Sequence, residues 1–167
     1  MLFYPRINSD QKSRFFRERR DDMKLSTRAR YGIHAMVDLA LFYGQGPQPL
    51  KAVAERQGIP EQYLEQLMCP LRREKLVAGV RGAQGGYMLA RPPEEITLGA
   101  LMRILEGPIS LANCLDDAGS CDKVGACPTR LVWERLSQCI DSVLDSVTLR
   151  DLLDDQARLC AQGKEHP

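Results

Sequence analysis

Three cysteines in the second half of the chain have the spacing with the clearest chemical meaning. Cys114, Cys121 and Cys127 follow a C-x6-C-x5-C pattern in a segment rich in glycine and aspartate. Thiolates are ligands of zinc, copper(I) and iron-sulfur clusters, and glycines let the backbone wrap around such a centre. The segment therefore predicts a soft metal centre, one ligand short of the usual four.

The chain has six cysteines in all. In a reducing compartment this number is more typical of metal or redox chemistry than of a disulfide framework. Cys69, Cys139 and Cys160 are not expected to be ligands, and Cys69 and Cys139 are expected to be buried as small apolar residues. Cys139 is also too far from the loop, because about 12 residues of helix at 1.5 Å each place it roughly 18 Å from Cys127.

The composition is that of a globular protein, with 44% hydrophobic and 27% charged residues. No apolar run approaches the roughly 20 residues that span a bilayer, and the N-terminal residues lack the apolar core of a signal peptide. We expect a cytoplasmic protein with no membrane partner. We do not expect an enzyme, because neither of the two histidines, His34 and His166, lies beside a nucleophile motif.

The charges are unevenly distributed along the chain. Residues 23–91 hold ten basic and five acidic side chains, whereas residues 92–167 hold seven basic and thirteen acidic ones. A basic front half is expected if that half meets a polyanion, although chance scatter on a solvated surface is the alternative. Residues 1–22 read as a poorly ordered extension or a wrongly assigned start, with a short arm on DNA phosphate as the alternative.

The elements before the cysteines form a helix-turn-helix pattern. Ser26 or Thr27 can cap a first helix that ends before Gly44. A second helix is predicted over 50–57, and Gly58 allows a tight turn. Pro60 is predicted to open a third helix that runs through Arg73 with a kink at Pro70.

The third helix has one apolar and one polar face. Tyr63, Leu64, Leu67, Met68 and Leu71 form the apolar stripe, which leaves the polar side chains pointing outward. Such side chains can read base edges or hold phosphates in a major groove, although an ordinary amphipathic surface helix has the same pattern. The outward set is Glu61, Gln62, Glu65, Gln66 and Arg72 or Arg73.

Residues 76–90 are predicted to form a two-stranded wing. Two short β-prone runs flank a turn with three glycines. Arg81 lies at the edge of this turn, where its guanidinium could enter a minor groove or grip phosphate. A nucleotide-binding loop is not expected here, because the Lys-Ser/Thr of a P-loop is missing and no helix follows at once.

A fourth helix is predicted from about Ile96 to Gly107, and a long one begins at Pro128. The long helix carries an apolar stripe with Trp133 on its flank, and a second copy of the chain is the economical partner for that stripe. A homodimer would place two recognition helices on a palindromic site. Residues 148–154 are predicted to form a short helix that packs back on the core.

These elements predict a mainly α fold with a small two-stranded β wing, in which a winged helix-turn-helix domain is joined to a long dimerisation helix. The expected parts are a DNA-binding domain over 23–91, a helix and cysteine loop over 92–128, a dimerisation helix and packing segment over 129–156, and a frayed tail over 157–167.

From Met23 to about Gln156 the sequence resembles the IscR family of bacterial winged-helix regulators, also called the Rrf-two family. The resemblance rests on Met23-Lys24-Leu25-Ser26, Arg30-Tyr31-Gly32, Ile59 with Tyr63-Leu64-Glu65-Gln66-Leu67, Val80-Arg81-Gly82, Gly85-Gly86-Tyr87, the three cysteines, Trp133 and Thr148-Leu149.

The resemblance implies a dimeric DNA-binding transcription factor that responds to an iron-sulfur cluster on Cys114, Cys121 and Cys127. It also implies that Glu65 and Arg81 belong to the DNA surface. The full set of expected DNA contacts is Ser26, Thr27, Arg28, Gln62, Tyr63, Glu65, Gln66, Arg81 and Gly82.

The sequence departs from this family at the fourth ligand. The position of the family's histidine is Arg130, which cannot ligate because its guanidinium stays protonated. In nitric-oxide-sensing relatives, an aspartate of the partner subunit is the fourth ligand, and the matching position here is Arg30. His34 lies one helical turn beyond Arg30 on the same face, so the partner subunit's His34 is a candidate ligand instead. The other candidates are Asp116, Asp117, Asp122, an exogenous thiol or water.

A 2Fe-2S cluster is slightly favoured over a 4Fe-4S cluster, and zinc is the alternative occupant of the loop. A second function stays open beside the cluster sensor. This is a cluster-free or zinc-binding regulator of cysteine or sulfur metabolism that acts through a protein partner, as members of the same family can do.

Overall fold

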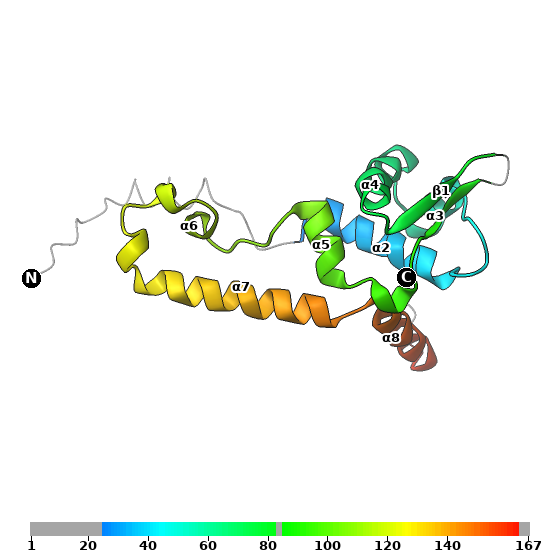
Figure 1. Ribbon diagram of the computed structural model, residues 1–167. Coiled ribbons are helices and arrows are strands. Elements are labelled where there is room, and N and C mark those ends of the chain that lie inside the picture. Colours follow the sequence, from blue (N-terminus) through cyan, green and yellow to red (C-terminus); the bar gives the residue numbers. More distant parts are fainter. Residues whose placement is uncertain (1–24, 83–84, 164–167) are drawn as a thin grey trace, which may run out of the picture.

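The computed structural model describes residues 25–82 and 85–163, so the predicted N-terminal extension and the wing residues 83 and 84 lie outside it (Figure 1). A two-stranded antiparallel sheet accompanies a mostly helical chain, which confirms the predicted fold class. The elements are α2 (Thr27–Leu41), α3 (Leu50–Gln57), α4 (Glu61–Arg73), β1 (Val77–Val80), β2 (Gly86–Leu89), α5 (Leu98–Glu106), α6 (Asn113–Asp116), α7 (Pro128–Ser146) and α8 (Leu149–Ala161), with 3-10 turns at Pro93–Glu95, Ala118–Ser120 and Val124–Ala126.

Local signals set most of these boundaries. Ser26 caps α2, and its side chain accepts a hydrogen bond from the backbone N–H of Ala29 at 3.1 Å. Gly58 ends α3 in the left-handed conformation that glycine adopts without steric cost. Pro60 precedes α4 as its cap instead of opening it, and Pro70 falls inside this single helix.

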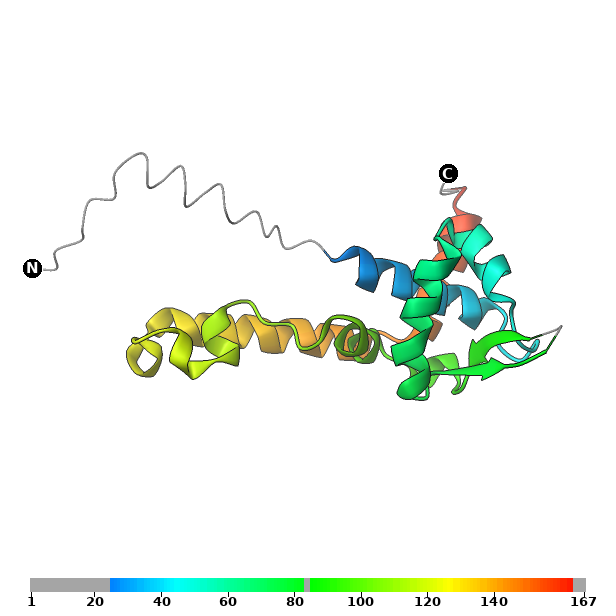
Figure 2. The same cartoon turned by 90° about the horizontal axis from the view of Figure 1, so that it is seen from above.

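The core lies where α2, α4 and α5 meet the base of the wing. Leu39 from α2, Leu67 from α4, Val77 from β1 and Leu101 from α5 are almost completely buried. Leu149 at the start of α8 is also buried, as predicted for a segment that packs back on the core. Figure 2 shows this unit at one end of the molecule, with α7 extending away from it.

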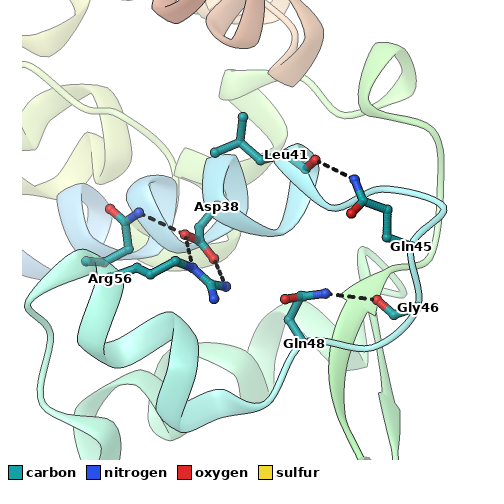
Figure 3. A network of polar contacts seen from close by, with 7 residues as sticks. Asp38, Leu41, Gln45, Gly46, Gln48 and Arg56 are labelled. Carbon is teal, nitrogen blue, oxygen red and sulfur yellow. Dashed lines mark hydrogen bonds and ion pairs between the residues drawn. The ribbon is translucent and has the colours of Figure 1, made fainter.

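A buried carboxylate joins α2 to α3 (Figure 3). Asp38 is 1% exposed and accepts hydrogen bonds from Arg56 Nε at 2.9 Å, Arg56 Nη2 at 2.7 Å and Gln57 Nε2 at 3.0 Å. The hydrogen bond to Asp38 raises the pKa of Arg56, and its guanidinium lies 4.5 Å from the centre of the Phe42 ring. Because a buried carboxylate is stable only when it is paired, this network fixes the angle between the two helices.

The helix α7 is attached to the core at its C-terminal end. The backbone N–H of Leu98 donates to the carbonyl of Val147 at 2.8 Å, and Arg103 from α5 pairs with Asp145 at 2.5 Å. No residue of α7 is buried in the single chain. In the single chain, α7 is therefore held to the core near its C-terminal end and contacts α6 of the cysteine loop.

The end of α8 differs from the expectation. A frayed tail was predicted over 157–167, but α8 continues to Ala161. Thr148 and Asp151 form a capping box at its start, and Arg158 lies in its last turn, where a cation offsets the helix dipole. In the part of the chain that is described, no helix has the length and apolar character needed to cross a bilayer.

Candidate DNA-binding surface and cysteine loop

The polar face of α4 is open to solvent. Gln62, Glu65 and Gln66 are exposed, whereas Leu64 and Leu67 are buried below them. Tyr63 is half-buried and packs edge-on against Tyr31, with ring centres 6.0 Å apart. Of the four DNA contacts predicted on this helix, Gln62, Glu65 and Gln66 are therefore available to form hydrogen bonds. The fourth, Tyr63, packs partly against the core.

The wing presents its arginine at the end of β1. Arg81 and Gly82 are both exposed, and Gly82 has a φ of 120°, which favours glycine. Val77 pairs with Leu89 and Val80 with Gly86 in the antiparallel register. The loop after α2 braces the wing, because Gln48 exchanges two backbone hydrogen bonds with Tyr87, at 2.8 and 2.9 Å.

The start of α2 is the third part of the predicted surface. Thr27 and Arg28 are exposed, but Ser26 is half-buried and its hydroxyl donates to the carboxylate of Glu106. Glu106 also accepts a hydrogen bond from the backbone N–H of Ala29 at 3.1 Å. This acidic residue ends α5, directly before the cysteine loop, and no local pattern in the sequence pointed to the contact.

The three predicted ligands lie on a loop that runs back along the N-terminal half of α7 (Figures 1 and 2). Cys114 in α6 and Cys127 at the start of α7 are half-buried, and Cys121 is exposed. Across residues 25–82 and 85–163, no three His, Cys, Asp or Glu side chains converge as a site for a metal ion. The donor chemistry suits a thiophilic centre, but the loop has to draw the thiols together to hold one.

The Cys127 thiol has hydrogen-bond partners close to it in the sequence. Its Sγ lies 3.0 Å from the Thr129 hydroxyl. This hydrogen bond, followed by one from the backbone N–H of Arg130, lowers the pKa of Cys127 below its ordinary value. A thiol at the start of a helix is favoured as thiolate, which is the form that binds metals.

We predict that alkylation of Cys127 in the metal-free protein rises at a lower pH than alkylation of a cysteine in a short unstructured peptide. A lowered pKa means that the reactive thiolate appears at lower pH. The measurement is the iodoacetamide rate of each cysteine against pH, followed by mass spectrometry. Thr129→Val should move the Cys127 profile to higher pH, and an unmoved profile would contradict the role of this hydroxyl.

The candidates for a fourth ligand are spread over the chain. Arg130 Nε lies 2.9 Å from Glu134 Oε1, so the residue at the family's histidine position is paired within α7. His34 is exposed on α2. Asp117 accepts a hydrogen bond from the backbone N–H of Gly119 at 2.8 Å, and Asp116 and Asp122 are exposed.

The prediction that Cys69 and Cys139 are buried is wrong for the single chain, since both are exposed. Cys69 points away from the buried positions Leu67, Met68 and Leu71 of α4. Cys139 lies on an uncovered face of α7. The apolar pattern correctly predicted that both thiols lie on helices. The further prediction that they face inward is the part that fails.

That uncovered face has a regular spacing. Val132, Leu136, Cys139 and Val143 recur at intervals of four, three and four residues, which puts them in one line along α7. Val132, Leu136 and Val143 are 50%, 43% and 62% exposed. We call these four residues the α7 seam.

Comparisons with known proteins agree on one family. The profile described as "Rrf2: Iron-dependent Transcriptional regulator" matches residues 25–155. The HTH-type transcriptional regulator CymR of Bacillus subtilis is 45% identical over 130 residues, which cover 78% of this chain and 89% of that protein. The HTH-type transcriptional regulator IscR of Sodalis glossinidius is 40% identical over 134 residues, covering 80% and 81%.

Solved structures give the same result. The structure described as T. potens IscR has a TM-score of 0.67 and 46% identity, over 81% of this chain and 89% of that one. The structure of CymR, the global cysteine regulator of B. subtilis, has a TM-score of 0.65 and 44% identity, over 77% and 95%.

Proposed function

The chain belongs to the Rrf2 family of transcriptional regulators, and from this premise we propose that it binds operator DNA as a homodimer under the control of its cysteine loop. The relatives are named as transcriptional regulators, and the chain is not an enzyme. The observation that carries the proposal is the exposed polar face of α4 beside the exposed Arg81 of the wing. Binding to chromosomal DNA implies a cytoplasmic protein.

The DNA surface has three parts in this proposal. Gln62, Glu65 and Gln66 read base edges in the major groove, with Tyr63 at the margin of that face. Arg81 and Gly82 bring the wing against the minor groove or its phosphates. Thr27 and Arg28 meet phosphate at the start of α2, and Ser26 acts through the cap of that helix. The domain is proposed to span residues 23–91.

A second copy of the chain covers the α7 seam. The seam has the spacing of residues that pack between two helices, and nothing in the single chain covers it. Two copies related by a two-fold axis would present two copies of α4 to a palindromic operator. We assign dimerisation and the packing of α8 to residues 129–156, and the helix and cysteine loop to residues 92–128.

Cys114, Cys121 and Cys127 are the proposed protein ligands of an iron-sulfur cluster, with 2Fe-2S slightly favoured over 4Fe-4S. Such a cluster would supply redox chemistry to the loop, since its presence and its oxidation state depend on iron, oxygen or nitric oxide. The chain links the loop to the DNA surface through Glu106, which caps α2 just before the loop begins. At the other end, Arg103 and Asp145 tie α5 to α7. Closure of the loop can therefore change the spacing of the two α4 helices.

A second candidate function has its own support. Arg130 replaces the histidine ligand expected from the family, and a relative with 45% identity is CymR, described in its solved structure as a global cysteine regulator. The alternative is a cluster-free or zinc-binding regulator of cysteine or sulfur metabolism that acts through a protein partner. Metal analysis of the purified protein separates the two.

We predict that Arg81→Ala weakens binding to the promoter of the protein's own gene about tenfold, roughly uniformly across sequences, because a phosphate or groove contact is lost. Glu65→Ala should instead relax sequence preference at one position of each half-site, as expected for a base contact worth about 1–3 kcal/mol. Gel shifts with a panel of single-base operator variants measure both effects.

Arg150→Ala is the matched control for Arg81→Ala. It removes one exposed arginine from α8, away from α4 and the wing, and should leave the affinity unchanged. Equal binding of the wild type and Arg81→Ala at all salt concentrations would contradict the role of the wing.

A further inference from the structure

Lys75, in the turn between α4 and the wing, has an unusual backbone for its residue type. Its φ is 56°, and it is the sole non-glycine residue with a positive φ within residues 25–82 and 85–163. Side chains with a Cβ are disfavoured in this left-handed region because the Cβ approaches the following carbonyl oxygen. A lysine here costs folding free energy that a glycine would not.

The turn itself needs the left-handed residue. The backbone N–H of Leu76 donates to the carbonyl of Leu71 at 3.0 Å, and that of Lys75 to the carbonyl of Arg72 at 3.1 Å. Leu71 and Leu76 are both buried. This pair of hydrogen bonds is the Schellman ending of a helix, in which glycine is the preferred residue at the position that Lys75 occupies.

The lysine is not needed to satisfy the end of the helix. A cation near a helix C-terminus offsets the dipole, but Arg72 and Arg73 already stand in the last turn of α4. The Lys75 side chain is exposed and forms no ion pair with any carboxylate of the described residues. A strained residue whose side chain has no ion-pair partner among the described residues is a candidate for a functional role.

Geometry places this turn at the wall of the groove that α4 would enter. The 13 residues of α4 span about 20 Å at 1.5 Å per residue, whereas a major groove is about 12 Å wide. If the first turns of α4 read base edges, its C-terminal end extends past the width of the groove, and in homeodomains this end of the recognition helix contacts the DNA backbone. Arg72 lies over the wing here, with its Nη1 3.8 Å from where a Cβ on Gly79 would stand.

We propose that Lys75 is a phosphate contact, which extends the DNA surface from α4 to the wing as a basic band of Arg72, Arg73, Lys75 and Arg81. This inference rests on the proposed function of DNA binding. The occupant is the sugar-phosphate backbone of duplex DNA, so Lys75 adds affinity but no sequence preference. The chain keeps a strained lysine because the left-handed turn is where its ammonium reaches the phosphate strand.

The test compares Lys75→Gly with Lys75→Asn and Lys75→Arg in the full-length dimer. Lys75→Gly should raise the midpoint of thermal unfolding by about 2–4 °C and yet weaken operator binding. The plot of log affinity against log salt should become shallower by about 1.8 for the dimer, from about 0.9 for each lost contact. Lys75→Asn tolerates the left-handed backbone without charge and should lose the same slope, while Lys75→Arg should keep it.

Arg150→Gln is the control for net charge, since it removes one positive charge from α8 and should leave the slope unchanged. A salt slope for Lys75→Gly equal to that of the wild type, on an operator that the wild type binds, would overturn the phosphate contact alone. A wild type that binds no DNA at any salt concentration would instead remove the proposed function and, with it, the contact.

Discussion

Replacing Cys114, Cys121 and Cys127 together by alanine should give a folded protein that retains no iron and no sulfide after anaerobic purification. The fold should survive because none of the three cysteines belongs to the buried core: Cys114 and Cys127 are half-buried and Cys121 is exposed. Operator DNA should still be bound, but its affinity should no longer change with iron, oxygen or nitric oxide. This complete loss of response is the largest effect that we expect from the loop.

The measurement combines iron and acid-labile sulfide analysis with absorption and Mössbauer spectra on protein that begins at Met23. Two irons per subunit in the wild type indicate a 2Fe-2S centre, and four indicate a 4Fe-4S centre. The control replaces Cys69, Cys139 and Cys160 by alanine and should retain the wild-type content. Zinc in place of iron would favour the alternative function, and an unchanged response of the loop variant would refute the sensing role.

Aspartates introduced into the α7 seam should separate the dimer. Leu136→Asp with Val143→Asp places charges at the centre of a face that a second copy would bury, where an unpaired charge is costly. The monomer should stay folded because no residue of α7 is buried in the single chain. Affinity for a palindromic operator should fall at least about 100-fold, because the two subunits are no longer linked and each binds its half-site independently.

Light scattering and sedimentation give the oligomeric state, and gel shifts give the affinity. Gln138→Asp is the matched control, since Gln138 is exposed on the same helix but lies off the seam and outside the apolar stripe. It should leave both the dimer and the affinity intact. A doubly substituted protein that still sediments as a dimer would show that a different surface joins the subunits.

The sequence by itself determined most of the elements of this protein, because their signals are local. The cap at Ser26, the left-handed turn at Gly58 and the glycines of the wing each act within a few residues. The period of 3.6 residues on α4 was enough to predict which side chains face out, and Gln62, Glu65 and Gln66 are exposed as expected. Their contacts with DNA remain predictions.

Only the tertiary structure decided features that join distant parts of the chain. Ser26 meets Glu106 across 80 residues, and Asp38 is neutralised by Arg56 from the next helix. No local pattern encodes such pairs, because they depend on how the helices pack. Cys69 was expected inside for a related reason, since residue type alone does not tell which side of a helix is covered.

For the cysteine loop, the sequence predicts the chemistry and the tertiary structure decides the positions of the thiols. Thiol chemistry and spacing predict a metal centre, but the single chain does not gather the three sulfurs. The strain at Lys75 was equally invisible, because a left-handed φ arises from the turn that joins α4 to β1. Residue types determine which chemistry is possible, and packing decides where the groups that carry it come to lie.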